Sequence, residues 1–214
     1  MRRLLLLILS FTLMGIFNPA AVFATSAAKK IIVIDPGHGG WDPGKVGKNN
    51  VLEKDINLAI AEDLQVLLET AGATVFLTRA EDTALGDKKN ADLTARANMP
   101  ADMQADIFIS IHQNAFATER AKGAQTFYYG DSEDSHRLAQ AIQTRMQEFL
   151  NQDNNKTATA NSGYFVLKKT QTPAVLVECG FLTNSDDLQK LATENYQEKV
   201  AWGIYLGILD YFAY

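Results

Sequence analysis

The chain has 214 residues, of which 47% are apolar and 21% charged, and its formal net charge is −5. These fractions are typical of a globular protein, and the length suits one domain with a real core. Because the sequence contains no run of basic residues, nucleic acid is not an expected partner.

The first two dozen residues have the pattern of a signal peptide. Arg2 and Arg3 precede an apolar run at 4–17, and small residues lead to Ala24. We therefore expect export and cleavage after Ala24, which leaves a domain of residues 25–214. The apolar run is shorter than the roughly 20 residues of a spanning helix, although an uncleaved segment would leave an anchored form. With a single cysteine, the exported domain would depend on its core rather than on a disulfide.

Strands and helices are predicted to alternate along the rest of the chain. Residues 31–35 form an apolar, mostly β-branched run that enters a loop rich in glycine, which continues to residue 50. The later apolar patterns predict a helix at 51–71, a strand at 74–78, a helix at 92–103, strands at 105–111 and 124–129, a helix at 131–150, an extended stretch at 164–167, a strand at 174–177, and helices at 186–191 and 194–211. This order predicts an α/β fold of three layers, with a mostly parallel twisted sheet and helices on both faces.

Four residues with metal-binding or acid–base side chains are predicted to meet at one edge of this sheet. His38, His112 and Glu178 each follow a predicted strand, and Glu53 lies in the first turn of the first helix. Parallel strands present their carboxyl ends at the same edge, where ligands bind. Two imidazoles and one carboxylate suit Zn²⁺ with a position left for water, and the other carboxylate would act as a base. The residues alone leave open which glutamate binds metal and which catalyses.

Each of these residue types also has a structural interpretation. Glu53 could merely stabilise the N-terminus of its helix. Glu178 could be a structural carboxylate paired with Arg79 or Arg96. Cys179, which follows it on a buried strand, is interpreted as a packing residue rather than a nucleophile.

Four segments together resemble the zinc-dependent N-acetylmuramoyl-L-alanine amidases of the Amidase_3 family. They are IDPGHGGWDPG, LEKD, SIHQNA and PAVLVECGFLTN. They occur in the family's order, and the resemblance covers residues 30–214. It implies that His38, Glu53 and His112 hold one Zn²⁺ per chain and that Glu178 is the catalytic acid–base.

The resemblance also implies a substrate, peptidoglycan. The expected reaction is hydrolysis of the amide between the lactyl group of N-acetylmuramic acid and L-Ala of the stem peptide. Arg79, Arg96 and Asn114 are candidates for binding substrate, although Asn114 could instead orient its loop. Trp41 and Asp42 could touch substrate or brace the glycine loop. The alternatives are a zinc peptidase or deacetylase acting on another wall amide, and a non-catalytic wall-binding protein.

Two further segments resemble the single-domain amidases of the spore cortex and of germination. They are GAQTFYYG and YQEKVAWGIYLGILDYF. This similarity implies cortex maturation as the role, the cell wall or the forespore intermembrane space as the location, and an exported lipoprotein as a candidate partner. The run 119–123 is too short for the autoinhibitory helix that some relatives insert, so an open site is expected.

Overall fold

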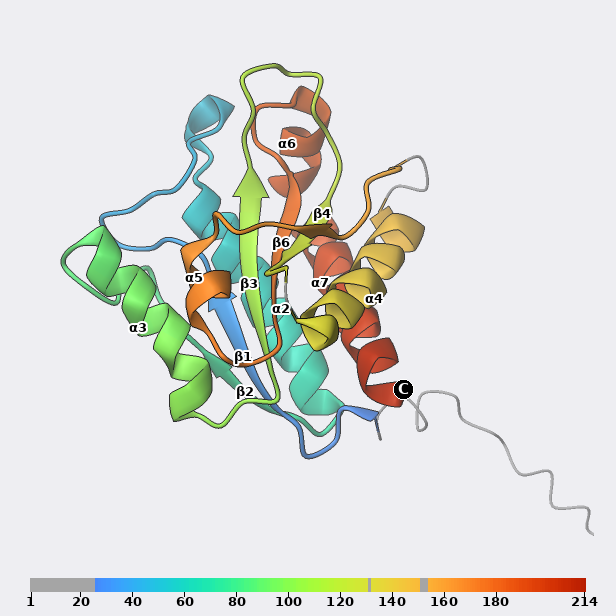
Figure 1. Cartoon of the computed structure of the whole chain (residues 1–214). Coiled ribbons are helices and arrows are strands. Elements are labelled where there is room, and N and C mark those ends of the chain that lie inside the picture. Colours follow the sequence, from blue (N-terminus) through green and yellow to red (C-terminus); the bar gives the residue numbers. More distant parts are fainter. Residues whose placement is uncertain (1–25, 131, 151–153) are drawn as a thin grey trace, which may run out of the picture.

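The computed structural model describes residues 26–130, 132–150 and 154–214. The predicted signal peptide lies outside these residues. In the described part, the strands form one twisted sheet with helices on both faces (Figure 1), as predicted. The elements in chain order are β1 (Ile31–Pro36), η1 (Lys48–Asn50), α2 (Glu53–Thr70), β2 (Thr74–Leu77), α3 (Lys89–Asp102), β3 (Ile107–Asn114), β4 (Gln125–Tyr128), α4 (Glu133–Leu150), β5 (Thr159–Ala160), α5 (Phe165–Lys169), β6 (Ala174–Phe181), α6 (Ser185–Leu191) and α7 (Glu194–Ala213).

The sheet is mostly parallel, and its strand order is β2-β1-β3-β6-β4-β5. The neighbours β2, β1, β3 and β6 all run in the same direction. Strand β4 pairs antiparallel with β6, and the short β5 pairs parallel with β4. The carboxyl ends of the four parallel strands therefore meet at one edge of the sheet, which is where binding sites form in open α/β sheets.

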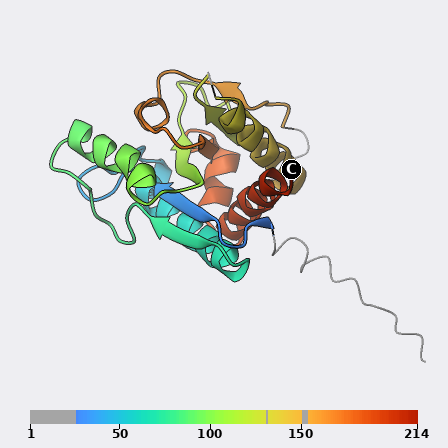
Figure 2. The same ribbon diagram turned by 60° about the horizontal axis from the view of Figure 1, so that its bottom comes forward.

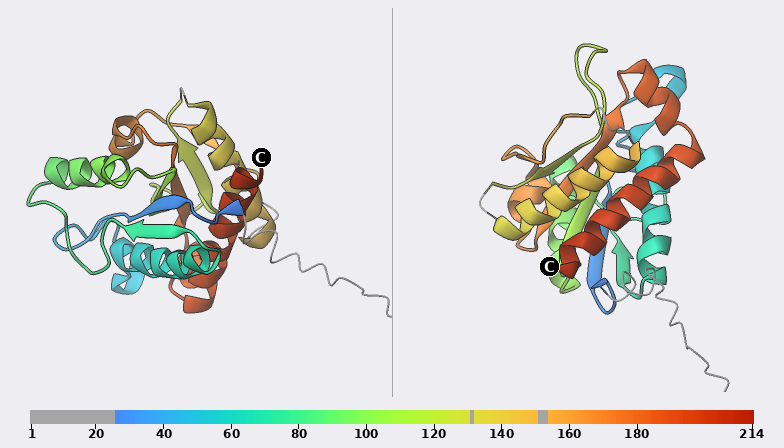
Figure 3. Two further views of the ribbon diagram at one scale, coloured as in Figure 1. Left: turned by 90° about the horizontal axis from the view of Figure 1, so that it is seen from below. Right: turned by 90° about the vertical axis from the view of Figure 1, so that its right-hand side faces the viewer.

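Side chains of the parallel strands alternate between two apolar layers. Ile109 and Val177 belong to the larger cluster, which lies under α2, α4 and α7. Phe108 and Leu176 point to the opposite face and pack with residues of α3 and α5. Figures 2 and 3 show the helices that cover the two faces, with α3 and α7 on opposite sides of the sheet. Strands buried on both faces explain why their sequences are continuous apolar runs.

The structure differs from the sequence-based expectations at several places. The stretch 164–167 was expected to be extended, but α5 begins at Phe165, and this helix is too short to show a helical period. A two-residue strand, β5, lies in the region expected to be a loop. Strands β3 and β6 also continue beyond His112 and Glu178, to Asn114 and Phe181. The two site candidates therefore project from the face of the sheet rather than from loops.

Among the described helices, none combines the length and the apolar character that a membrane span requires.

Candidate active site

The loop after β1 holds His38 in a backbone conformation that is unusual for a residue other than glycine. His38 has φ 64°, in the left-handed region. Two arginines hold three successive carbonyls of this loop: Arg79 and Arg96 both donate to the carbonyl of Pro36, Arg79 also donates to Gly37, and Arg96 to His38. These contacts fix the direction in which the imidazole points.

These contacts change the role expected for the two arginines. Arg96 is 1% exposed, and all five of its N–H groups are occupied by the carboxylates of Asp35 and Asp92 and by loop carbonyls. Arg79 is also buried and donates to four backbone carbonyls. The prediction that Arg79 and Arg96 bind substrate is therefore not supported, because their donors are directed inward and brace the glycine loop.

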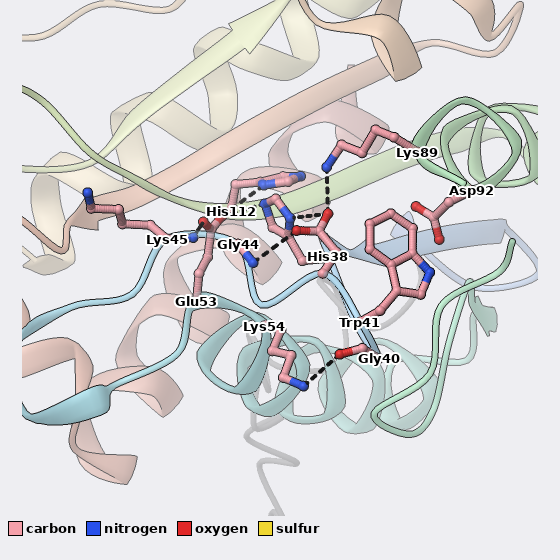
Figure 4. Close-up of polar contacts among 12 residues, drawn as sticks. His38, Gly40, Trp41, Gly44, Lys45, Glu53, Lys54, Lys89, Asp92 and His112 are labelled. Carbon is pink, nitrogen blue, oxygen red and sulfur yellow. Dashed lines mark hydrogen bonds and ion pairs between the residues drawn. The ribbon is translucent and has the colours of Figure 1, made fainter. Parts of the chain in front are cut away.

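His38, Glu53 and His112 converge, as Figure 4 shows. The Nε2 atom of His38 lies 3.2 Å from Oε1 of Glu53, and Nδ1 of His112 lies 3.0 Å from the same oxygen. Candidate ligand atoms of the three side chains all lie within 4.8 Å of one another. These side chains, which the sequence predicted to meet at one edge of the sheet, come from a loop, a helix and a strand.

Two glycines of the loop make room for this cluster. A Cβ on Gly37 would lie 2.2 Å from the His112 ring, and one on Gly44 would lie 2.6 Å from a carboxylate oxygen of Glu53. Gly44 also has φ +67°. Any larger side chain at Gly37 would displace the imidazole, so the glycines are required by the packing of the site as well as by the turn.

The Glu53 carboxylate is buried and surrounded by donors. It is 4% exposed, and besides the two imidazoles it accepts bonds from the backbone N–H groups of Lys45, at 2.7 Å, and Gln113, at 3.1 Å. Burial alone would raise the pKa of Glu53, but the contacts with His112 and His38 outweigh it and hold this pKa well below its ordinary value. Glu53 is therefore an anion at the centre of the cluster, beyond any role at its helix terminus.

Asp42 orients the ring of His38. Its Oδ2 lies 2.8 Å from Nδ1 of His38 and 2.5 Å from the ammonium of Lys89. Burial raises the pKa of Asp42, but Lys89 and His38 together lower it to about 2. The indole of Trp41 donates to the carbonyl of Gly86 at 2.9 Å, which ties the loop to a neighbouring one. These contacts agree with the alternative in which Trp41 and Asp42 brace the glycine loop.

Glu178 lies beside the cluster on the same face of the sheet. It is paired in register with His112, and it is 7% exposed. The hydroxyl of Tyr164 donates to its Oε1 at 3.1 Å. Burial raises the pKa of Glu178 to about 7, against the lowering effect of His112 and of the Tyr164 bond. The structural alternative, a pair with one of the two arginines, is not found, since both bind elsewhere.

Asn114 orients a loop in the structure. Its side-chain oxygen accepts a bond from the N–H of Ala115 at 2.8 Å, and its carbonyl accepts one from Leu182 at 2.9 Å. All residues at 115–124 are described and form no helix, which agrees with the expectation that no inserted helix covers the site.

A pocket of about 200 Å³ opens next to the cluster, between α3 and α5. His38, His112 and Tyr164 line one part of it. Its apolar wall comprises Leu93, Phe165, Val166 and Leu176. A substrate with both polar and apolar parts could therefore lie against the cluster.

The three converging residues could hold a metal ion. Imidazole nitrogens and a carboxylate oxygen are metal ligands, and two imidazole nitrogens already turn toward one anionic oxygen. Asp42 fixes one imidazole from behind, as outer carboxylates do in metal sites. Sequence reasoning missed Tyr164, because nothing in its local pattern signalled a contact with a strand residue 14 positions away.

Residues 32–210 match the model of the family described as N-acetylmuramoyl-L-alanine amidase, Amidase_3. The chain belongs to this family. The family consists of hydrolases, and the resemblance predicted from the four sequence segments is confirmed.

Relatives within the family include a germination-specific amidase and an amidase solved with a lipoprotein. The germination-specific N-acetylmuramoyl-L-alanine amidase of Bacillus subtilis is 38% identical over 191 residues, which cover 86% of this chain and 80% of the relative. The CwlD amidase of Clostridioides difficile, solved in complex with the GerS lipoprotein, is 40% identical with a TM-score of 0.83, over 86% of this chain and 99% of that one. The catalytic domain of CwlV from Bacillus (Paenibacillus) polymyxa is 31% identical with a TM-score of 0.74, over 86% and 98%.

Proposed function

We propose that the protein is a Zn²⁺-dependent amidase that cleaves the bond between the lactyl group of N-acetylmuramic acid and L-Ala of the peptidoglycan stem peptide. The observation that carries this proposal is the convergence of His38, Glu53 and His112 beside the buried carboxyl of Glu178. Membership of the amidase family supports the choice of bond.

His38, Glu53 and His112 would hold the metal ion. Two imidazoles and one carboxylate form a donor set typical of catalytic zinc, with a position left open for water. Bound Zn²⁺ would polarise the scissile carbonyl and bring the pKa of a bound water from about 15.7 to near 7. Asp42 would keep the His38 ring in one orientation.

Glu178 would act as the general base and then as the general acid. It would take a proton from the attacking water and pass it to the departing stem-peptide nitrogen. A pKa of about 7 suits a group that must both accept and release a proton near neutral pH. Glu53, whose pKa is lowered, would stay ionised throughout. Where the pKa values of two neighbouring carboxylates shift in opposite directions, one carboxylate is typically a ligand or stabiliser and the other is the acid–base group.

We further propose that the domain acts outside the cytoplasm after removal of a signal peptide that ends at Ala24, and that it trims peptidoglycan during maturation of the spore cortex. A germination-specific relative supports this role. A relative solved with a lipoprotein supports a lipoprotein partner, which would raise zinc affinity or activity. Zinc affinity measured with and without the host's exported lipoproteins tests that part.

Digestion of purified peptidoglycan by the zinc-loaded protein tests the reaction. Mass spectrometry should detect free stem peptides that begin at L-Ala, together with glycan strands that have lost them. Chelation of the metal should abolish this release, and the Glu178→Gln variant should slow it by at least about a hundredfold.

Other products would contradict the proposal. Shortened peptides still attached to muramic acid would indicate a peptidase, and glucosamine residues without their acetyl groups would indicate a deacetylase. Intact glycopeptides that remain bound to the protein would indicate a wall-binding protein without turnover.

A further inference from the structure

Tyr164 stands at the point where the chain enters α5, next to the pocket and to Glu178. Its hydroxyl donates to Oε1 of Glu178 at 3.1 Å. Its ring packs against Phe127 at 5.4 Å between centroids, within the apolar cluster under α3 and α5. Packing therefore fixes the position of the ring. It also fixes the position from which the hydroxyl donates to the carboxylate.

The two oxygens of Glu178 have different surroundings. Oε1 accepts the bond from Tyr164, whereas Oε2 is buried and has no hydrogen-bond partner among the described residues. A buried polar atom without a partner is unfavourable, and such atoms in native structures call for an explanation. Glu178 pairs in register with His112 and shares its face of the sheet, so a molecule bound at the cluster would lie within reach of this carboxylate.

We propose that Tyr164 is a positioning residue that anchors Oε1 of Glu178, so that Oε2 is the oxygen that exchanges the proton. This inference rests on the proposed function, in which Glu178 is the acid–base group. The anchor removes rotation of the carboxylate about its last bond, because one oxygen is fixed. Burial and the Glu178 charge raise the pKa of Tyr164, so the phenol keeps the proton that it donates.

The Tyr164→Phe variant removes only the hydroxyl and retains the ring. Its kcat on peptidoglycan fragments should fall about tenfold, which is the rate equivalent of losing one hydrogen bond to a charged group. KM and zinc content should stay at the wild-type values. Tyr129→Phe is the matched control, because Tyr129 packs against the same apolar cluster, and it should leave kcat unchanged.

A double-mutant cycle with Glu178→Gln separates positioning from other roles. If Tyr164 acts through the carboxylate, adding Tyr164→Phe to Glu178→Gln should cause little further loss of the residual rate. Wild-type kcat in the single variant, an equal loss in both backgrounds, or a fall in zinc content would each overturn the proposal.

A crystal structure of zinc-loaded Tyr164→Phe gives a readout that does not need turnover. The Glu178 carboxylate should lose its single orientation, whereas Tyr129→Phe should keep it. An ordered, unmoved carboxylate in the first variant would overturn the inference. A wild-type protein that releases no stem peptide would instead contradict the proposed function, and the structural comparison would still decide the role of Tyr164.

Discussion

Glu53 and Glu178 are two carboxylates at one site, and their surroundings have opposite effects on them. Both are buried, at 4% and 7% exposure. Glu53 receives bonds or close contacts from two imidazoles and two backbone N–H groups, and its pKa is lowered. Glu178 has one hydroxyl donor and one oxygen without a partner among the described residues, and its pKa rises to about 7.

The comparison shows that the number and charge of donors, rather than burial, decide which carboxylate stays ionised. The region around Glu53 receives its two backbone donors from Lys45 in the glycine loop and from Gln113, at a point where the pairing of β3 with β6 is irregular. The region around Glu178 is the middle of a strand, where the backbone groups are already paired in the sheet. The fold thereby separates the region of the proposed metal ligands from that of the proposed acid–base group.

The largest expected effect is on turnover when Glu178 can no longer exchange a proton. Glu178→Gln keeps the size of the side chain, and kcat should fall by about a hundredfold to ten-thousandfold, the range of general acid–base catalysis. Release of stem peptides at saturating substrate measures it. If Glu178→Gln retains more than half of the wild-type rate, Glu178 is not the acid–base group and the two carboxylates do not have the different roles proposed for them.

The next effect concerns Asp35, which holds Arg96 and through it the loop that carries His38. Asp35 is 1% exposed and accepts bonds from Arg96, Thr78 and Ser110. Asp35→Asn removes one of the two carboxylates that pair with the buried guanidinium of Arg96, and the free energy of unfolding should fall by about 1.5–3 kcal/mol. Chemical denaturation measures this loss. Thr78→Val, which removes only one neutral donor, is the control and should cost about 1 kcal/mol.

The pH dependence of that stability has a definite sign. Burial raises the pKa of Asp35, but Arg96 and Thr78 outweigh it and the net shift is downward from 3.8. A carboxyl with a lowered folded-state pKa stabilises the fold fully above its unfolded pKa, and this contribution is lost as the pH falls below it. Wild-type stability should therefore drop below about pH 4, and Asp35→Asn should flatten that drop. If stability falls equally at low pH in the wild type and in Asp35→Asn, Asp35 is not the source of that loss.

A smaller effect is expected from Asp42, which contacts Nδ1 of His38, one of the proposed metal ligands. Asp42→Asn weakens the hold on the His38 ring, and zinc affinity should fall by about 10–100-fold. Competition with a chromogenic chelator measures it. Asp102→Asn, at an exposed position of α3, should bind zinc as the wild type does. Equal affinities in both variants would show that Asp42 does not orient the ligand.

The sequence was sufficient to predict the parallel part of the sheet and to place four candidate site residues together at its edge. Continuous apolar runs predict strands that are covered on both faces, and polar residues after them mark the carboxyl edge. The same local patterns could not predict the start of α2. The helix was predicted from residue 51, but Asn49 and Asn50 have positive φ angles and the helix begins only at Glu53.

The roles of the surrounding residues depend on contacts that no local pattern encodes. Arg96 reaches the carbonyl of His38 across 58 positions of sequence, and it is fully occupied once Asp35 and Asp92 are included. From sequence, an arginine near the site could as easily have been a substrate contact. Tyr164 is similar, because its contact with Glu178 exists only through the packing of a short helix on the sheet.

Zinc binding by Glu53→Gln and Glu178→Gln, measured side by side with the wild type, tests the division of roles most directly. Glu53→Gln should lose more zinc affinity than the roughly 10–100-fold cost of an outer contact, because it removes a ligand. Glu178→Gln should bind zinc as the wild type does while lacking turnover. Equal loss of zinc in the two variants, or a greater loss in Glu178→Gln, would contradict the assignment of Glu53 as ligand and Glu178 as acid–base.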